Sequence, residues 1–595
     1  MTGGEPNGRP IPATQHAIQI VGAGEIVHNR AKPVPRPGPH QILVRMEAVG
    51  ICFSDTKLLH AFTSHPRKSE VLAGLDADVL AEIPSYVPGR LPTVPGHEPV
   101  GHIVAVGDRV SRHRVGERCL IQTDYRHLPT AAANAAFGYN FEGGLQEYVL
   151  LDERMIIEPD TGERFLIPVG ETPSASAVAL VEPWACVEAS YAYRERQRPL
   201  LGGRLLVVAD AGHAVTGIAS LIREARPAGL TALIADAADL HAIEAAGFPV
   251  TSVTDIAGIP RQLFDDIVYF GADAATIEAL QDCLAFRGLI NVVTGGTSIG
   301  RPIALDVGRV HYDLTRWTGT TGTSATEGYA SIPADCEVRA GDRMGVIGAA
   351  GPMGLMHVVR AASAGWKDLS IAALDIDDSR LAHLERAAGP IARSRGVGLK
   401  VVNSRSGEVA PGFSYIALMV PASPLVGQAV ALAGSGCRIN IFAGFATGTR
   451  AEVDLDRYIE RRCYFLGTSG SGIPDMKAVL RKVENGELDT NISLDAVTGF
   501  EGVADALAAV EGRTASGKIM VYPTLPDLGL VRLSEMGERF PGVAAALDDG
   551  RWTKAAEREL LRLAGRPETP GTGEAPETRG TEEAPEPPAT PEPPA

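Results

Sequence analysis

The first part of the chain alternates apolar and polar positions in short runs that glycine and proline separate. Between residues 17 and 190 these runs include AIQIV, QILVRMEAVGI and EPVGHIVAVG. Alternation with a period of two, in β-branched runs of this length, is typical of half-buried strands. The pattern therefore predicts a compact, mainly β domain.

From about Gly203 the pattern changes to strands that alternate with helices. LLVVAD is a continuous apolar run followed by a glycine turn and a helical stretch, and TALIAD is followed by ADLHAIEAAG. IVYFGA and LINVVTGG continue the series. Buried strands in alternation with helices predict a parallel sheet with helices on its faces.

The same alternation then starts again with MGVIGAAGPMGLMHVVRAASAG. The glycine turns that close at Gly217 and Gly354 correspond, and LINVVTGG corresponds to RINIFAGF. Each copy also carries an Asp, at Asp306 and Asp454, before a Gly-Thr turn. This repeated order predicts an internal duplication of one nucleotide-binding type of domain, with ordinary α/β patterning as the alternative.

Composition is that of a globular chain with more than one core. The chain has 595 residues, of which 45% are hydrophobic and 21% charged. A net charge of −17 argues against nucleic acid or an anionic membrane as the main partner. No apolar run reaches the roughly 18 residues of a membrane span. The N-terminal residues lack the pattern of a secretion signal, so we expect a cytoplasmic protein.

A nucleotide-binding turn is predicted in the second α/β copy. Gly351 would let the backbone approach a pyrophosphate at a helix N-terminus, and Asp375 ends the next strand, where a carboxylate binds ribose hydroxyls. An acid there repels a 2′-phosphate, so NAD is favoured over NADP. The candidate cofactor-binding residues are Ala349, Gly351, Pro352, Met353, Gly354, Asp375 and Arg380.

The first copy carries a poorer version of this turn. Its order is Gly212-x-Ala214-x-x-Gly217, with Asp236 at the end of the next strand. The methyl group of Ala214 would crowd a pyrophosphate. A structural role is therefore favoured for this turn, and the second copy is expected to bind the nucleotide.

A metal site is predicted from three separate segments. Cys52, His97 and Glu182 offer one sulfur, one nitrogen and one oxygen ligand. A catalytic zinc needs three protein ligands and one open position. The seven cysteines are scattered and odd in number, so neither a disulfide framework nor a four-cysteine zinc site is expected.

These segments resemble the zinc-dependent medium-chain dehydrogenase/reductases. The likeness lies in GICFSD (50–55), GHEPVGHIVAVG (96–107), GGLQEYV (143–149), VEPWAC (181–186), GPMG (351–354) and GKIMVYP (517–523). It covers roughly residues 17–525. The Glu-Pro pair resembles the polyol and sugar dehydrogenase branch, such as sorbitol dehydrogenase. FGYNFEGGLQEYV is similar to members of the sorbose-1-phosphate reductase type.

The resemblance implies roles for the site residues. Cys52, His97 and Glu182 would hold one catalytic zinc, Glu182 directly or through water, and Glu98 would be an alternate ligand. Ser54 would relay a proton, and Asp55 would hydrogen-bond His97. The cofactors implied are zinc and NAD, and the partner is a small alcohol, sugar or sugar phosphate. A homodimer or homotetramer is also implied, although the inserted copy could block the sheet edge that joins such assemblies.

The fold class expected is α/β, with a GroES-like β-rich catalytic domain and two tandem Rossmann-type, doubly wound parallel-sheet domains. The expected boundaries are 1–192 for the catalytic domain, 193–324 and 325–490 for the two Rossmann-type domains, and 491–527 for a return segment that completes the catalytic domain. A helical appendage follows at 528–565, with two short amphipathic helices expected in LVRLSEMGERF (530–540) and WTKAAERELLRLAG (552–565), and a disordered tail rich in proline and glutamate at 566–595.

Two features depart from the resemblance. The segment between Cys52 and His97 is long, and we interpret the surplus, 61–91, as a loop. Its His65-Pro-Arg67-Lys68 is expected to be solvated, with a substrate-phosphate site as the alternative. Residues 123–140 hold no cysteine, so no structural zinc is expected. Rival interpretations are a zinc-free alkene or quinone reductase of the same fold and a non-catalytic NAD(H) sensor.

Overall fold

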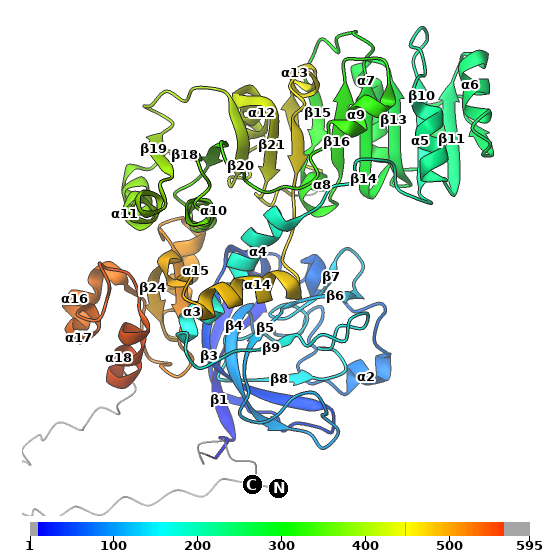
Figure 1. Ribbon diagram of the computed structural model, residues 1–595. Helices are drawn as coiled ribbons and strands as arrows, with labels where there is room; N and C mark the ends of the chain where they lie inside the picture. The colour runs from blue at the N-terminus through cyan, green and yellow to red at the C-terminus, as the bar shows by residue number, and fades with distance from the viewer. Residues whose placement is uncertain (1–9, 447, 565–595) are drawn as a thin grey trace, which may run out of the picture.

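The computed structural model describes residues 10–446 and 448–564. Figure 1 shows a lower β-rich domain beneath an upper lobe in which two α/β units lie side by side. The predicted Pro/Glu-rich tail lies outside the described residues. Among the described residues, no helix has the length and apolar character needed to cross a membrane.

The lower domain is built on an eight-stranded sheet that joins both ends of the chain. Its order is β26-β24-β25-β3-β4-β5-β9, with β8 also pairing with β3. The strands are β3 (Gln41–Ile51), β4 (Glu98–Val106), β5 (Arg118–Ile121), β8 (Tyr148–Asp152), β9 (Leu166–Pro168), β24 (Leu494–Thr498), β25 (Lys518–Val521) and β26 (Val531–Arg532). Hairpins β1 (Thr14–Gly22)–β2 (Glu25–Pro33) and β6 (Asp124–Pro129)–β7 (Asn134–Ala136) complete it. The segment expected to return to this domain thus supplies β24 and β25.

The first α/β unit has a six-stranded sheet in which all neighbours are parallel. Its order is β12-β11-β10-β13-β14-β16. The strands are β10 (Arg204–Ala209), β11 (Gly229–Ile234), β12 (Val250–Ser252), β13 (Phe264–Phe270), β14 (Leu284–Val293) and β16 (Arg316–Thr320). The helices are α5 (Ile218–Ala225), α6 (Ala237–Glu244), α7 (Ala274–Leu280), α8 (Val307–Tyr312) and α9 (Ala325–Ala330).

The second α/β unit repeats that topology strand for strand. Its parallel order is β19-β18-β17-β20-β21-β23. The strands are β17 (Arg343–Ile347), β18 (Ser370–Asp375), β19 (Gly398–Asn403), β20 (Phe413–Leu418), β21 (Ala433–Ile441) and β23 (Tyr464–Leu466). The helices are α10 (Pro352–Ala364), α11 (Asp378–Arg395), α12 (Ser423–Leu432), α13 (Leu455–Glu460) and α14 (Ile473–Glu484). Both sheets have the doubly wound order 3-2-1-4-5-6 of dinucleotide-binding folds. This confirms the predicted fold class, while a common origin of the two units stays a prediction.

The two α/β units are joined by a short antiparallel pair. Strand β15 (Ile303–Asp306) of the first unit pairs with β22 (Arg450–Val453) of the second. Buried apolar residues of both sheets form one continuous cluster that includes Val292 and Ile439. The units therefore share a core rather than a thin linker.

The remaining helices lie around the β domain or connect it to the α/β lobe. They are α1 (Phe53–His60), α2 (Ala77–Ala81), α3 (Ala175–Ala179), α4 (Val181–Ala192), α15 (Val503–Glu511), α16 (Met536–Arg539), α17 (Pro541–Ala544) and α18 (Lys554–Ala564). The prediction of the first of the two helices in the appendage is wrong for the start of that segment. Val531 pairs with Val497 at the sheet edge, so the segment begins as β26. The second corresponds to α18, whose buried Glu557 accepts hydrogen bonds from the backbone of Ala175 and Ser176.

Candidate metal and nucleotide sites

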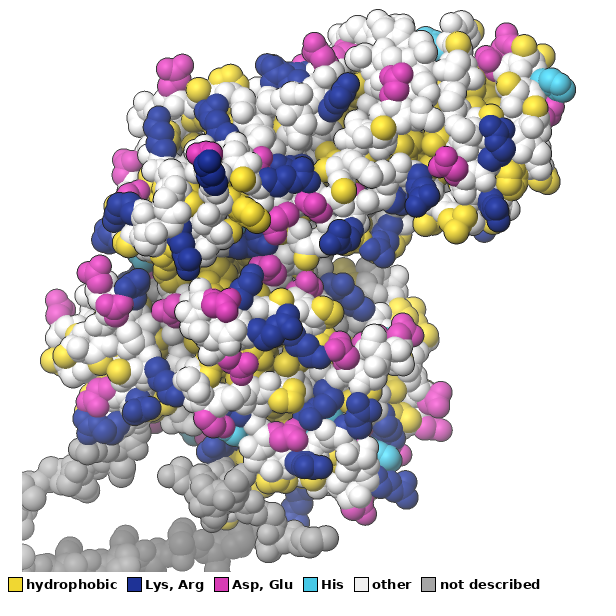
Figure 2. Space-filling view, in the orientation of Figure 1, with side chains coloured by type: hydrophobic (Ala, Val, Ile, Leu, Met, Phe, Trp, Pro, Cys, Tyr) yellow, Lys and Arg dark blue, Asp and Glu magenta, His cyan; other side chains and the backbone are white. Residues whose placement is uncertain are grey.

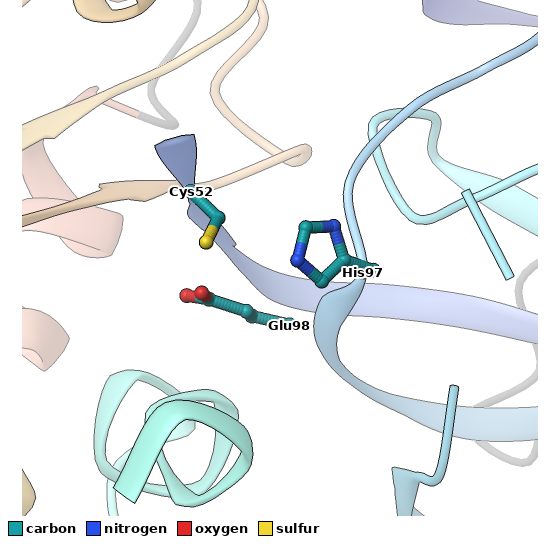
Figure 3. A group of neighbouring side chains, drawn as sticks. All are labelled: Cys52, His97 and Glu98. Atoms are coloured by element: carbon teal, nitrogen blue, oxygen red, sulfur yellow. The ribbon is translucent and has the colours of Figure 1, made fainter. Parts of the chain in front are cut away.

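Three potential metal ligands meet where two central strands of the β domain face each other. Cys52 follows β3, and His97 and Glu98 lie at the start of β4. Their ligand atoms all lie within 4.8 Å of one another, and Figure 3 shows the side chains converging. A Cβ on Gly50 would lie 2.2 Å from Glu98 Oε2, so the glycine before Cys52 leaves room for this carboxylate.

Asp55 fixes the two ligand segments relative to each other. Its carboxylate accepts hydrogen bonds from the backbone N–H of Cys52 at 2.9 Å and of Gly96 at 3.2 Å. His97 Nδ1 lies 3.1 Å from Asp55 Oδ1. With Nδ1 engaged by a carboxylate, Nε2 is the nitrogen left for a metal. Asp55 is 1% exposed, so this arrangement is buried.

A buried cation next to the cluster favours the metal-binding form of Cys52. Burial raises the pKa of the Cys52 thiol, but the charge of Lys518 and the hydrogen bond to His97 outweigh it and hold that pKa below its usual value. The thiolate is the form that binds metals. Lys518 also forms a buried ion pair with Glu98 Oε1.

The second carboxylate oxygen of Glu98 is independent evidence that this site can bind a cation. Within the described part of the chain, Glu98 Oε2 is buried and has no hydrogen-bond partner. An unsatisfied buried carboxylate oxygen is costly unless a cation or a donor meets it. Together with the sulfur of Cys52 and a nitrogen of His97, the Glu98 carboxylate oxygen makes a mixed set of ligands. Zinc accepts such a set.

Glu182 lies beside the cluster and not within the group of three. It is in the first turn of α4, and Cys186 Sγ lies 3.6 Å from its Oε1. Burial, opposed by His97 and helped by the nearby Cys52, raises the pKa of Glu182 to about 7. The structure thus brings Glu98, expected as the alternate ligand, to Cys52 and His97. Ser54 Oγ lies 3.4 Å from Cys52 Sγ, at the edge of the same cluster.

The predicted nucleotide turn of the second unit lies between β17 and α10, at the carboxyl edge of its sheet. Gly351 is the N-cap of α10, and Pro352 and Met353 open the helix. Asp375 ends β18, and its Oδ2 accepts a hydrogen bond of 3.0 Å from the backbone N–H of Ala350. The N-terminus of a helix next to a strand-end acid is the geometry that holds a dinucleotide.

Gly354 and Gly351 have different structural roles in this turn. A Cβ on Gly354 would lie 2.4 Å from the carbonyl oxygen of Gly348 and 2.6 Å from Cα of Ala349, so helix and strand could not pack as closely. A Cβ on Gly351 would meet only Arg380 Nη2, at 3.1 Å, and the carbonyl oxygen of Gly348, at 3.8 Å. Gly351 therefore leaves space open in front of the turn, beside the Arg380 guanidinium.

Side chains fill the corresponding point of the first unit. Strands β10 and β13 are the neighbours where the strand order reverses, which is where such folds bind ligands. There the Tyr269 hydroxyl donates to Asp210, and the backbone N–H of Asp273 donates to that hydroxyl at 2.9 Å. His213 from the same turn lies 3.6 Å from the Cβ position of Gly295.

Residues 38–160 match the family model of the alcohol dehydrogenase GroES-like domain. A zinc-type alcohol dehydrogenase-like protein of Escherichia coli is 31% identical over 144 residues, which are 22% of this chain and 36% of that protein. Mannitol-1-phosphate 5-dehydrogenase of Aliivibrio fischeri is 24% identical over 54% of this chain and 77% of its own length. The predicted resemblance to zinc-type alcohol dehydrogenases is thus confirmed for the GroES-like domain. Other first relatives are matched over 58% or less of their length.

A solved structure, the 2R,3R-butanediol dehydrogenase of Bacillus subtilis, aligns with 86% of this chain at a TM-score of 0.48 and 14% identity, covering all of that chain. The match to the family model covers the part of the chain that carries Cys52, His97 and Glu98. The family model ends at residue 160 and does not reach Glu182.

The segment 65–68 is not a solvated loop as expected. Pro66–Lys68 form a short 3-10 helix, and Lys68 is fully buried. Its ammonium group donates to the carbonyl oxygen of Leu91 at 2.9 Å and also to that of Val87. Burial lowers the pKa of Lys68 to about 7. Lys68 therefore holds the insert together, whereas Arg67 faces the metal cluster.

Two residues next to the cluster were missed by the sequence interpretation. Lys518 comes from the far end of the chain and pairs with Glu98, and the Tyr139 ring lies 5.7 Å from the His97 ring. GKIMVYP, already part of the resemblance, contained the signal for Lys518. No motif pointed to Tyr139.

Replacing Asp55 by asparagine should weaken metal binding by about 10–100-fold, the usual effect of removing a carboxylate that orients a ligating histidine. The neutral amide no longer stabilises the charge on His97 and does not enforce Nδ1–H. The measurement is zinc affinity by competition with a chelator. Asp78→Asn, at an exposed acid of the same domain, is the matched control. Equal zinc affinity in Asp55→Asn and in the parent would contradict the positioning role.

Proposed function

We propose that this protein is a zinc-dependent, NAD-linked oxidoreductase. It transfers a hydride between a nicotinamide and the hydroxyl or carbonyl carbon of a polyol, sugar or sugar phosphate. The observation that carries the proposal is the convergence of Cys52, His97 and Glu98 on one buried point, with Asp55 locking two of them. The polyol class is supported by the similarity to mannitol-1-phosphate 5-dehydrogenase.

Cys52, His97 and Glu98 would hold the zinc, with Glu182 as a buried acid next to it. When bound, zinc polarises the oxygen of a substrate and stabilises negative charge on it. Lys518 neutralises part of the charge of Cys52 and Glu98: it lowers the pKa of the Cys52 thiol, and it opposes the rise that burial gives to the pKa of Glu98. Ser54 is at the cluster's edge and only partly buried. Its hydroxyl can accept the substrate's hydroxyl proton and pass a proton outward.

The second α/β unit would bind the nicotinamide nucleotide. Its backbone at Gly351 leaves space for the pyrophosphate, and Asp375 would accept hydrogen bonds from the ribose hydroxyls. When bound, the nicotinamide would supply the hydride acceptor or donor, so the second unit would have to hold it in near contact with the reacting carbon. In oxidation, Ser54 would take up the hydroxyl proton of the substrate.

Zinc content is the first test. We expect about one zinc per chain by elemental analysis of the purified protein, and NAD reduction, followed by absorbance, with members of a panel of polyols and polyol phosphates. A value near two would show a second metal site beyond the one described. A value near zero after metal-replete expression would refute the zinc-dependent reaction. NADH binding with no turnover on any member of the panel would instead favour the sensor.

A further inference from the structure

The two α/β units contact each other across an approximate two-fold axis. In the β15–β22 pair, Ile303 faces Val453, Ala304 faces Glu452 and Leu305 faces Ala451. Each strand leads through an Asp cap into a short helix, α8 in the first unit and α13 in the second. The pairing is therefore symmetric about Ala304 and Glu452. An isologous interface between two copies of one domain has the same symmetry.

Each short helix lies over the last strand of the other unit. A Cβ on Gly467, after β23, would lie 2.7 Å from the carbonyl oxygen of Val310 in α8. A Cβ on Gly319, in β16, would lie 2.8 Å from Ile459 Cγ1 in α13. Close approach thus requires glycine at the corresponding position of both units. The first unit holds the place that a second copy would take in a symmetric dimer.

This arrangement brings the end of α8 to the carboxyl edge of the second sheet. His311 Nδ1 lies 3.1 Å from the carbonyl oxygen of Ile441, the last residue of β21. Tyr312 Oη lies 2.8 Å from the Cβ position of Gly444, and Lys57 Nζ lies 3.6 Å from the same point. Lys57 is on α1, which begins directly after Cys52. Residues of all three folded units therefore meet at one point near the cluster.

Positive charge gathers at this junction although the whole chain has a net charge of −17. Arg67 lies over the Tyr139 ring, which also neighbours the rings of His65 and His97. Arg67 and Arg126 share the single carboxylate of Asp124, at 3.0 and 2.9 Å. Figure 2 shows Lys and Arg side chains, with Asp and Glu side chains among them, along the join between the α/β lobe and the β domain.

Lys57 adds a further cation to this surplus. Within the described residues it makes no ion pair, and its ammonium group lies 5.7 Å from the Phe53 ring centre. Burial lowers the pKa of His65 to about 4, helped by the charges of Arg67, Lys57 and His97.

We infer that the first α/β unit completes the substrate site of the second. Tyr312, with Lys57 and Arg67, forms an outer subsite that binds the anionic end, of the phosphate class, of an extended polyol. This inference rests on the proposed function. It assigns a role to a unit whose own ligand-binding point is filled by Tyr269 and His213. Lys57 supplies an unpaired charge, Arg67 a planar donor and Tyr312 a hydroxyl, a combination that suits phosphate oxygens.

The test compares D-mannitol 1-phosphate with D-mannitol as probes, using the full chain with zinc and NAD. The parent is expected to prefer the phosphorylated polyol in kcat/KM. Lys57→Met should lower that preference about 10–100-fold, the value of a hydrogen bond to a charged group. Tyr312→Phe should lower it less, by several-fold, because one neutral donor is lost. In both variants, kcat/KM for D-mannitol and the zinc content should stay within about twofold of the parent.

Glu460→Gln is the matched control, because Glu460 ends α13 as Tyr312 ends α8, on the side of the first unit. It should change neither probe. A parent without preference for the phosphorylated probe, or variants that lose activity on both probes equally, would overturn the inference.

Equilibrium binding of the probes to the enzyme–NADH complex separates this inference from the proposed function. Binding of the phosphorylated probe that depends on Lys57, without turnover, would uphold the subsite and refute the dehydrogenase. Turnover with an unchanged preference in both variants would uphold the dehydrogenase and refute the subsite. Neither binding nor turnover of either probe would overturn both.

Discussion

Replacing Cys52 by serine is expected to reduce bound zinc from about one to well below 0.1 per chain and to lower kcat/KM by about 1,000-fold or more. Serine offers a hydroxyl that stays protonated, whereas the Cys52 pKa is held low beside Lys518 and His97. The oxygen is also harder and shorter-reaching than the thiolate that zinc prefers. Losing several kcal/mol of transition-state stabilisation corresponds to this loss in rate.

Cys283→Ser in the first α/β unit is the matched control, because Cys283 is another free cysteine, buried in a different core. It should leave the zinc content and the rate unchanged, even if a polar atom in the core lowers stability by about 1–3 kcal/mol. Circular dichroism and thermal unfolding would show that both variants are folded. Hydride transfer that survives in Cys52→Ser at more than a tenth of the parental rate would refute metal-assisted catalysis at this site.

Much of the fold could be predicted because its signals are local. Continuous apolar runs such as LLVVAD and MGVIG are buried strands, and the glycine turns after them mark each strand-to-helix change. The pairing of β25 with β3 joins residues that are far apart in sequence, and only the resemblance of the closing GKIMVYP segment indicated it. The helix expected over the start of the appendage failed, because sheet pairing at Val531 overrode its helical periodicity.

The residues of the candidate site could likewise be predicted where local structure places them, and could not where tertiary packing does. The backbone hydrogen bonds of Asp55 are set by a short helix turn, so its sequence neighbours Cys52 and Ser54 could be placed with it. Choosing between Glu98 and Glu182 as the third member depends on how α4 packs against β4, which no local spacing specifies. The burial of Lys68 likewise depends on carbonyl oxygens about 20 residues away, so its charge in a loop was misinterpreted as solvated.

Replacing Gly351 by valine is expected to weaken NADH binding by more than about 100-fold, or about 2.7 kcal/mol, while leaving the fold intact. The backbone at Gly351 has φ of −82°, which any residue adopts, and its Cβ position meets only Arg380 Nη2 within 3.4 Å. The new side chain therefore projects into the open space in front of the α10 N-terminus, where a pyrophosphate would approach. Titration of NADH fluorescence gives the affinity, and zinc content should be unaffected.

Ala214→Val provides the matched change in the first unit, because Ala214 is exposed and already carries the methyl group that Gly351 lacks. If the second unit binds the nucleotide, Ala214→Val leaves NADH affinity unchanged, since Tyr269, Asp210 and His213 already fill the space behind it. The reverse result, with affinity lost in Ala214→Val and kept in Gly351→Val, would move the nucleotide to the first unit. The position of Tyr312 beside Gly444 of the second unit would then need another explanation.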